Sequence, residues 1–237
     1  MTPEETAQAT AAGVSTIGSH FMTSGSTYKR GGEIGFTGLD FYVTGRAGVL
    51  GPVDADVVTA TFAWFEPDMV RANWKPERAT EAALEFAQCA YRWADEKLPP
   101  DVDHARLGEL AGRVVDAASP AGAPLFAAWR RLPLPESPTA LAIHHLNGLR
   151  ELRGGLHAGA TLATGLRPVE ALLVKTPHMA PLFGWSEPHP DVTALGDRWQ
   201  EAEDGTNRAI APAFAVLDDA ERDELAGLIQ TVHTAVS

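Results

Sequence analysis

Two arginines and a histidine recur at helical spacing in the second half of the chain. Arg150, Arg153 and His157 are separated by three and then four positions, which places them on one helical face if the helix continues through Gly154 and Gly155. Two guanidinium groups can hold a carboxylate or phosphate through paired hydrogen bonds. A histidine beside them can exchange a proton near neutral pH. The spacing indicates an anion site, and the alternative is a solvated face whose arginines pair with Asp and Glu.

The segment that follows predicts two helices joined by a tight turn. Residues 158–164 have helical character, Gly165 is typical of a left-handed helix terminator, and Pro168 is typical of a first helical position. This is the outline of a helix–turn–helix. Its second helix, residues 168–175, reads PVEALLVK and is almost wholly apolar. Because base readout needs polar side chains on such a helix, the composition argues against a nucleic-acid partner.

Helix signals recur along the whole chain, and no segment alternates as a strand would, so we predict an all-α fold. The polar, glycine-rich residues 23–35 are expected to form a mobile loop. Apolar stripes place Val57 and Leu84 on buried helix faces. The expected helices span residues 2–22, 39–50, 54–65, 76–97, 101–118, 125–131, 138–164, 168–175 and 218–236.

A proline-rich stretch divides the chain. Residues 119–137 are expected to connect an N-terminal helical unit, residues 1–118, to a helix-turn-helix-like C-terminal unit, residues 138–237. The last helix, residues 218–236, carries a strong apolar stripe. We expect this stripe to dock on another helix, either within the chain or across a homodimer.

Composition limits the partners. The 237 residues include 19 Lys and Arg against 31 Asp and Glu, for a formal charge of −12, so phosphate backbones and anionic membranes are repelled. The single cysteine, Cys89, permits no intramolecular disulfide, and the first ten residues lack the pattern of a signal peptide. No long uncharged apolar run occurs. We therefore expect a cytoplasmic protein with no membrane and no nucleic-acid partner.

Motifs for metals and cofactors are missing. His144 and His145 are adjacent and point about 100° apart on a helix, and no HExxH or CxxC spacing occurs. The glycine pair at 31–32 lacks the context of a phosphate loop. Cys89 has apolar and acidic neighbours, which favour a packing role over a nucleophilic one. We expect neither a metal nor a cofactor.

Three blocks of the sequence together resemble a known family. Residues 41–70 contain an aromatic residue, an Arg-Ala pair and Leu-Gly-Pro-Val, with Tyr42 and Arg46 at the first two features. Residues 132–172 contain Leu-Arg-Glu, Arg-Gly and a histidine, which is His157. With the closing acidic helix, these blocks are similar to an uncharacterised, mostly actinobacterial family that is helix–turn–helix-like and related to winged-helix regulators of the MarR type. His20 matches an N-terminal histidine of that family.

The resemblance implies degenerate helix–turn–helix or winged-helix-like units in a homodimer. The wing is reduced or lost here, because residues 185–191 form a short proline-rich link. Combined with the Arg/His face, the resemblance implies a pocket for an anionic or carbonyl-bearing small molecule, over which the loop at 23–35 would close. The predicted ligand-binding residues are Tyr42, Arg46, Arg150 and Arg153, and the predicted acid–base residues are His157 and His20.

Three possibilities stay open beside small-molecule binding. If a reaction takes place in the pocket, it is acid–base chemistry without a cofactor. The main alternative is a MarR-type transcriptional regulator that binds DNA. A third reading is a non-catalytic partner subunit, which would need an exposed apolar patch.

Overall fold

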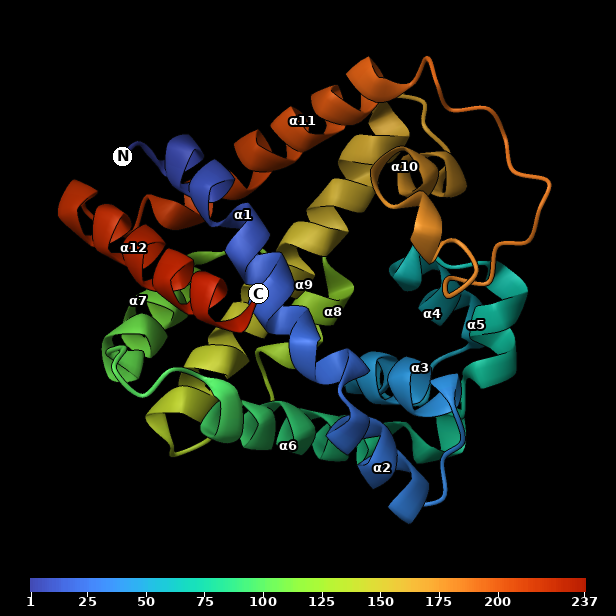
Figure 1. Cartoon of the computed structure of the whole chain (residues 1–237), viewed down its shortest axis with the longest axis horizontal. Helices are drawn as coiled ribbons and strands as arrows, with labels where there is room; N and C mark the ends of the chain where they lie inside the picture. Colours follow the sequence, from blue (N-terminus) through green and yellow to red (C-terminus); the bar gives the residue numbers. More distant parts are fainter.

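The computed structural model describes residues 1–237 and contains twelve α-helices, four short 3-10 helices and no β-strand (Figure 1). The all-α prediction is confirmed. Because the wing of a winged-helix protein is a β-hairpin, a wing is absent here. The α-helices are α1 (Pro3–His20), α2 (Gly25–Glu33), α3 (Leu39–Ala47), α4 (Ala55–Phe62), α5 (Pro67–Asn73), α6 (Ala79–Lys97), α7 (His104–Ala117), α8 (Pro124–Trp129), α9 (Pro138–Ala163), α10 (Pro168–Lys175), α11 (Gly196–Phe214) and α12 (Asp219–Val236). The 3-10 helices are η1 (Phe21–Thr23), η2 (Gly48–Leu50), η3 (Pro76–Arg78) and η4 (Pro177–Met179).

Helix α9 is the central element of the fold. It runs unbroken for 26 residues, and α1, α6, α7, α8 and α11 pack against it (Figure 1). Gly155 does not interrupt it but lets the chain pass closely, because a Cβ there would lie 2.7 Å from Cα of Ala123. Arg150, Arg153 and His157 therefore share one continuous helix. None of the helices has the length and hydropathy needed to cross a bilayer.

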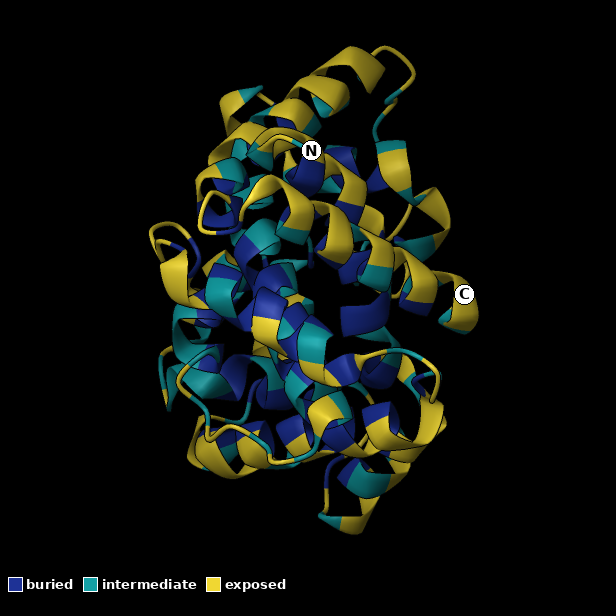
Figure 2. Cartoon of the chain, turned by 90° about the vertical axis from the view of Figure 1, so that its left-hand side faces the viewer, coloured by how far each residue is buried: buried dark blue, intermediate teal, exposed yellow.

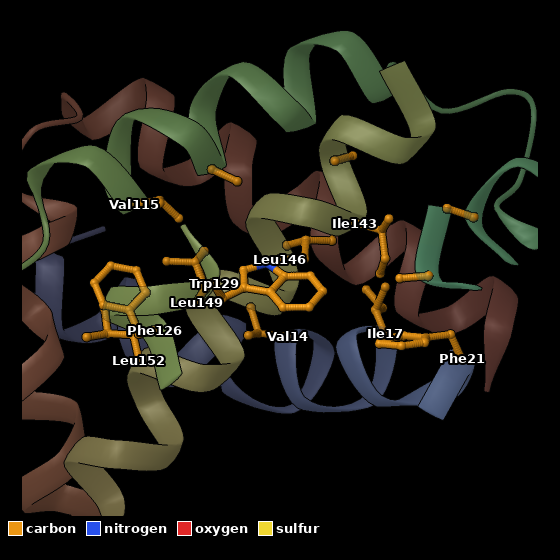
Figure 3. Close-up of a cluster of buried hydrophobic side chains, with 14 of the residues drawn as sticks. Val14, Ile17, Phe21, Val115, Phe126, Trp129, Ile143, Leu146, Leu149 and Leu152 are labelled. Carbon is orange, nitrogen blue, oxygen red and sulfur yellow. The ribbon is translucent and has the colours of Figure 1, made fainter. Parts of the chain in front are cut away.

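One large core holds these helices together. It contains 38 buried residues drawn from both sides of the 119–137 segment. In Figure 2, buried positions gather along the inward faces of the helices while the outward faces are exposed. In Figure 3, side chains of α1, α7 and α8 meet those of α9; the labelled residues are Val14, Ile17, Phe21, Val115, Phe126, Trp129, Ile143, Leu146, Leu149 and Leu152. Each fully buried side chain of this kind contributes about 1.5–3 kcal/mol of transfer free energy.

The prediction of a mobile loop at residues 23–35 is wrong, because most of this segment forms α2. The hydroxyl oxygen of Ser24 accepts a hydrogen bond from the backbone N–H of Thr27 at 3.3 Å and so caps the helix. Gly31 is needed for packing, since a Cβ there would lie 2.7 Å from the ring of Phe41. Glycine here permits close contact between helices rather than mobility.

Two smaller expectations also differ from the structure. Val57 and Leu84 are 47% and 45% exposed, because α4 buries only Val58 and Phe62 and because small alanines form much of the buried face of α6.

The turn after α9 forms as predicted. Gly165 has a φ of +76° and closes the helix, and Pro168 is the first residue of α10. The last helix, α12, packs on α1 and α7 within the same chain. A Cβ at Gly13 would lie 2.4 Å from the side chain of Ile229, so α1 and α12 cross closely. The apolar stripe of α12 is therefore covered intramolecularly, and homodimer formation stays a prediction.

His144 is a buried structural histidine. Its Nδ1 lies 2.8 Å from the hydroxyl of Tyr91, and its ring stacks on Trp129. Burial, with a smaller contribution from His145, lowers the pKa of His144 to about 4. The folded state therefore keeps this ring neutral under conditions that protonate the unfolded chain.

Stability should fall as the pH drops from 7 to 5. The unfolded histidine binds a proton below pH about 6.5, whereas folded His144 binds one only near its lowered pKa, which destabilises the folded state by about 2 kcal/mol at pH 5. In urea unfolding, His144→Gln should lose about 2 kcal/mol less of its free energy of unfolding between pH 7 and pH 5 than the unmodified protein does. His178 is exposed, so His178→Gln is the control and should lose as much free energy of unfolding as the unmodified protein. An equal loss in all three proteins would contradict the assignment.

Candidate anion-binding cavity

Five of the six predicted site residues line one cavity. It has a volume of about 580 Å³ and lies between α1, α3, α9, α10 and α11. The residues that the structure brings together are Tyr42, Arg46, Arg150, Arg153 and His157. Arg46 and His157 thus reach one cavity although more than a hundred positions separate them. The binding and catalytic roles of these residues stay predictions.

His20 does not reach this cavity. It is the last residue of α1, whereas the cavity is lined by the earlier part of that helix, residues 8–16. At about 1.5 Å per residue, His20 lies about 12 Å along the helix from the middle of that stretch. Its ring instead stacks on Trp93 with a centroid distance of 5.7 Å. Helix α2 also contributes no residue to the cavity, so the expected closing loop is not found.

Glu151 ties two of the arginines together. Its carboxylate accepts hydrogen bonds from Nε and Nη2 of Arg46 at 2.9 and 2.8 Å and from Nη1 of Arg150 at 2.7 Å. The side chains of Glu151 and Arg46 are only 3% and 11% exposed. Burial raises the pKa of Glu151, but the two guanidiniums outweigh it and hold that pKa below its usual range. One buried carboxylate therefore serves two cations.

The two arginines of this cluster differ in what they can still bind. Arg46 also donates from Nη1 to the hydroxyl of Tyr42 at 3.3 Å, so all three of its donor nitrogens have partners. Arg150 uses only Nη1, which leaves Nε and Nη2 without a protein acceptor. Arg46 is thus an anchor, and Arg150 has donors available to a ligand.

Helix α11 supplies the partners of Arg153 and His157. Arg153 donates to Asn207 at 2.9 Å and to Glu203 at 2.6 Å. Nδ1 of His157 lies 2.9 Å from the hydroxyl oxygen of Thr206, and its Nε2 lies 3.4 Å from Glu203. Burial lowers the pKa of His157, and Arg153 acts in the same direction, while Glu203 opposes them. The histidine is therefore held mainly neutral at pH 7.

The hydroxyl of Thr206 bears on which ring nitrogen of a neutral His157 carries the proton. The hydroxyl of Thr206 has two acceptors within reach, the carbonyl oxygen of Ala202 at 2.7 Å and Nδ1 of His157. If it donates to His157, a neutral ring directs its Nε2–H towards Glu203. If the Thr206 hydroxyl donates to the carbonyl oxygen of Ala202, Nδ1–H of His157 donates to the Thr206 oxygen. The ring then pairs with Glu203 only when Nε2 is protonated as well, which makes the ring cationic. In both cases Nε2 is the ring nitrogen that faces Glu203.

Aromatic side chains form much of the cavity wall. Trp64, Phe65, Phe183 and Trp199 line it, and Phe65 stacks on Phe183 with a centroid distance of 4.2 Å. Nζ of Lys175 lies 4.7 Å from the centre of the Trp199 ring. These rings offer flat surfaces beside the cationic groups.

The sequence analysis missed the acidic half of the site. Glu151 lies inside the resemblance, but its carboxylate had no assigned role, and α11 was not among the expected helices. The spacing of Trp199, Glu203 and Asn207 places one residue per helical turn and could have identified the facing helix. A pattern on one chain segment cannot show which distant segment it faces, so the pairing with α9 needed the structure.

Fold and site define an all-α protein with a helix–turn–helix outline at α9 and α10 and a charged, aromatic-walled cavity beside it. Over residues 7–237, the sequence matches a family described as a helix-turn-helix family. The chain belongs to this family. No curated protein and no solved structure matches it.

Removing the charge of Glu151 should destabilise the fold strongly. In Glu151→Gln, the nearly buried guanidinium of Arg46 loses its counter-charge, which typically costs about 3–5 kcal/mol. Urea unfolding at pH 7 measures this loss. The control Glu81→Gln removes an acid from the exposed pair with Arg78 and should cost less than about 1 kcal/mol. Equal effects of the two substitutions would show that the buried cluster is not a structural centre.

Proposed function

We propose that the protein binds a planar organic anion in this cavity and that His157 and Glu203 exchange a proton with it. The observation that carries the proposal is the unpaired cationic capacity of the cavity. Arg150 has two donor nitrogens without a protein acceptor, and the ammonium of Lys175 makes no hydrogen bond within the protein. A carboxylate or phosphate group supplies the missing acceptors.

Charge and shape support the same ligand class. Four cationic side chains line the cavity, those of Arg46, Arg150, Arg153 and Lys175. The three arginines pair with only two carboxylates, Glu151 and Glu203, so positive charge is in excess. The cavity volume lies in the range of small-molecule sites. The aromatic walls favour a planar ligand through stacking.

The acid–base groups give this site a chemical capacity beyond binding. Nε2 of His157 faces Glu203 at 3.4 Å in the cavity wall. A proton held between Nε2 of His157 and Oε1 of Glu203 can be given to, or taken from, a ligand group beside them. This is the arrangement required for acid–base chemistry without a cofactor.

Binding can be tested by isothermal titration calorimetry with 2-naphthoate. We expect saturable binding at one site, and Arg150→Gln should weaken it at least about tenfold, because a hydrogen bond to a charged group is worth about 1.5–3 kcal/mol. The control Arg131→Gln removes an exposed arginine outside the cavity and should leave the affinity unchanged. The uncharged analogue 2-naphthamide should bind more weakly than 2-naphthoate. Absence of binding, or equal binding of both compounds, would overturn the proposal.

Membership of a helix-turn-helix family favours a second candidate, a DNA-binding regulator, for which the sequence resemblance suggests the MarR type. In that case α10 would be the recognition helix. However, Ala171, Leu172 and Leu173 of α10 are buried, and its N-terminal Arg167 pairs with Glu170 at 2.7 Å. With a net charge of −12, these features favour ligand binding over base readout.

Fluorescence anisotropy with a labelled mixed-sequence DNA duplex tests the second candidate. At 50 mM salt, where electrostatic binding is strong, we expect no binding at micromolar protein. The duplex should stay unbound in the presence of 2-naphthoate as well. Binding that weakens steeply with added salt and is lost in Arg167→Gln would support the regulator instead.

A further inference from the structure

A second hollow adjoins the proposed anion site. It has a volume of about 520 Å³ and lies between α4, the start of α8 and the middle of α9. Much of its wall is apolar, with Val57, Ala60, Pro124, Leu125 and Ala158 among the lining residues. The exposure of Val57, which the sequence pattern did not predict, reflects its position at this hollow.

Only three residues line both hollows, namely Arg46, Trp64 and Gly154. Arg46 is fixed, because Glu151 holds it and its guanidinium lies 4.7 Å from the centre of the Phe62 ring. Trp64 is held differently. Its indole N–H has no hydrogen-bond partner, and its ring packs against the ring of His157 with a centroid distance of 5.3 Å. The boundary therefore combines one fixed side chain, one less constrained ring and one residue without a side chain.

The backbone that presents Trp64 is strained. The preceding residue, Ala63, has a φ of +40°, a conformation that residues with a Cβ rarely adopt and that costs of order 1–3 kcal/mol. This turn ends α4 and directs Trp64 to the boundary between the hollows. Strain of this kind concentrates at ligand-binding sites.

Gly154 is not required by packing. A Cβ at this position would meet no atom within 4 Å, in contrast to the neighbouring Gly155, which contacts Ala123. A glycine inside a helix costs about 1 kcal/mol relative to alanine. Its absent side chain instead leaves space on the surface of α9 where the two hollows meet.

We propose that the second hollow receives an apolar extension of the ligand whose anionic group lies at Arg150. This inference rests on the proposed function and narrows it to amphipathic ligands, a planar acid with an apolar tail. The tail passes Trp64 along the side-chain-free surface of Gly154 and lies among the apolar residues of α4 and α8. Burial of the tail adds affinity in proportion to the apolar area removed from water.

Calorimetric titration with 2-naphthoate and with 6-hexyl-2-naphthoate tests this assignment. In the unmodified protein, the hexyl compound should bind at least tenfold more tightly. In Gly154→Leu, the advantage of the hexyl compound should fall below threefold, because the new side chain fills the passage. Gly159→Leu is the matched control, since Gly159 lies on the same helix, has equal free space and lines neither hollow. It should keep the tenfold advantage.

A second variant fills the hollow from its outer side. Ala60 lines only the second hollow and is exposed, so Ala60→Trp leaves the arginine cavity intact. It should retain the affinity for 2-naphthoate within twofold and lose the hexyl advantage. Equal affinities of the two compounds in the unmodified protein, or a hexyl advantage retained in both filled variants, would overturn the inference and leave the proposed function standing. If neither compound binds, the proposed function itself fails.

Discussion

The buried carboxylate of Glu151 is the interaction on which the site depends. It lies between Arg46 from α3 and Arg150 from α9, and so joins the first half of the chain to the second across 105 positions. Removing a buried ion pair from water costs free energy, and here that desolvation cost is offset by three hydrogen bonds to a single carboxylate. Because Arg46 has no donor nitrogen left over, the cluster fixes the cavity wall while Arg150 keeps donors for a ligand. The unequal division of one carboxylate between two arginines therefore leaves donor nitrogens of Arg150 without a protein acceptor.

Helix α9 explains how groups with different tasks come together. Its residues 150–157 include the cations, the shared acid and the histidine, within about two helical turns. The same stretch contains two glycines with different structural roles. Gly155 permits the start of α8 to approach, and Gly154 leaves space between the two hollows. A rigid helix with a large core beneath it holds these positions more tightly than a loop would.

Sequence reasoning succeeded where the physics is local. Helical spacing, the Gly165 terminator and Pro168 are decided by neighbours a few positions away, and the structure contains them as expected. It failed where a distant partner decides. The segment 23–35 looked polar and flexible, but Gly31 is there to admit Phe41. His20 matched a pattern, yet its helix ends away from the cavity. Glu203, which pairs with Arg153 and His157, comes from α11, and no local signal linked this helix to α9.

The position of α10 connects family and function. In a DNA-binding helix–turn–helix, the second helix must present polar side chains outward. Here the same element turns Leu172 inward to line the cavity, and Lys175 at its end lies over Trp199. Packing takes up the apolar face of α10, whose residues Ala171, Leu172 and Leu173 are buried. The tight turn at Gly165 brings α10 back against α9, where α10 forms one side of the cavity. A helix–turn–helix outline is thus combined here with a helix that forms part of a cavity wall, and the fold alone does not decide which function the family member has.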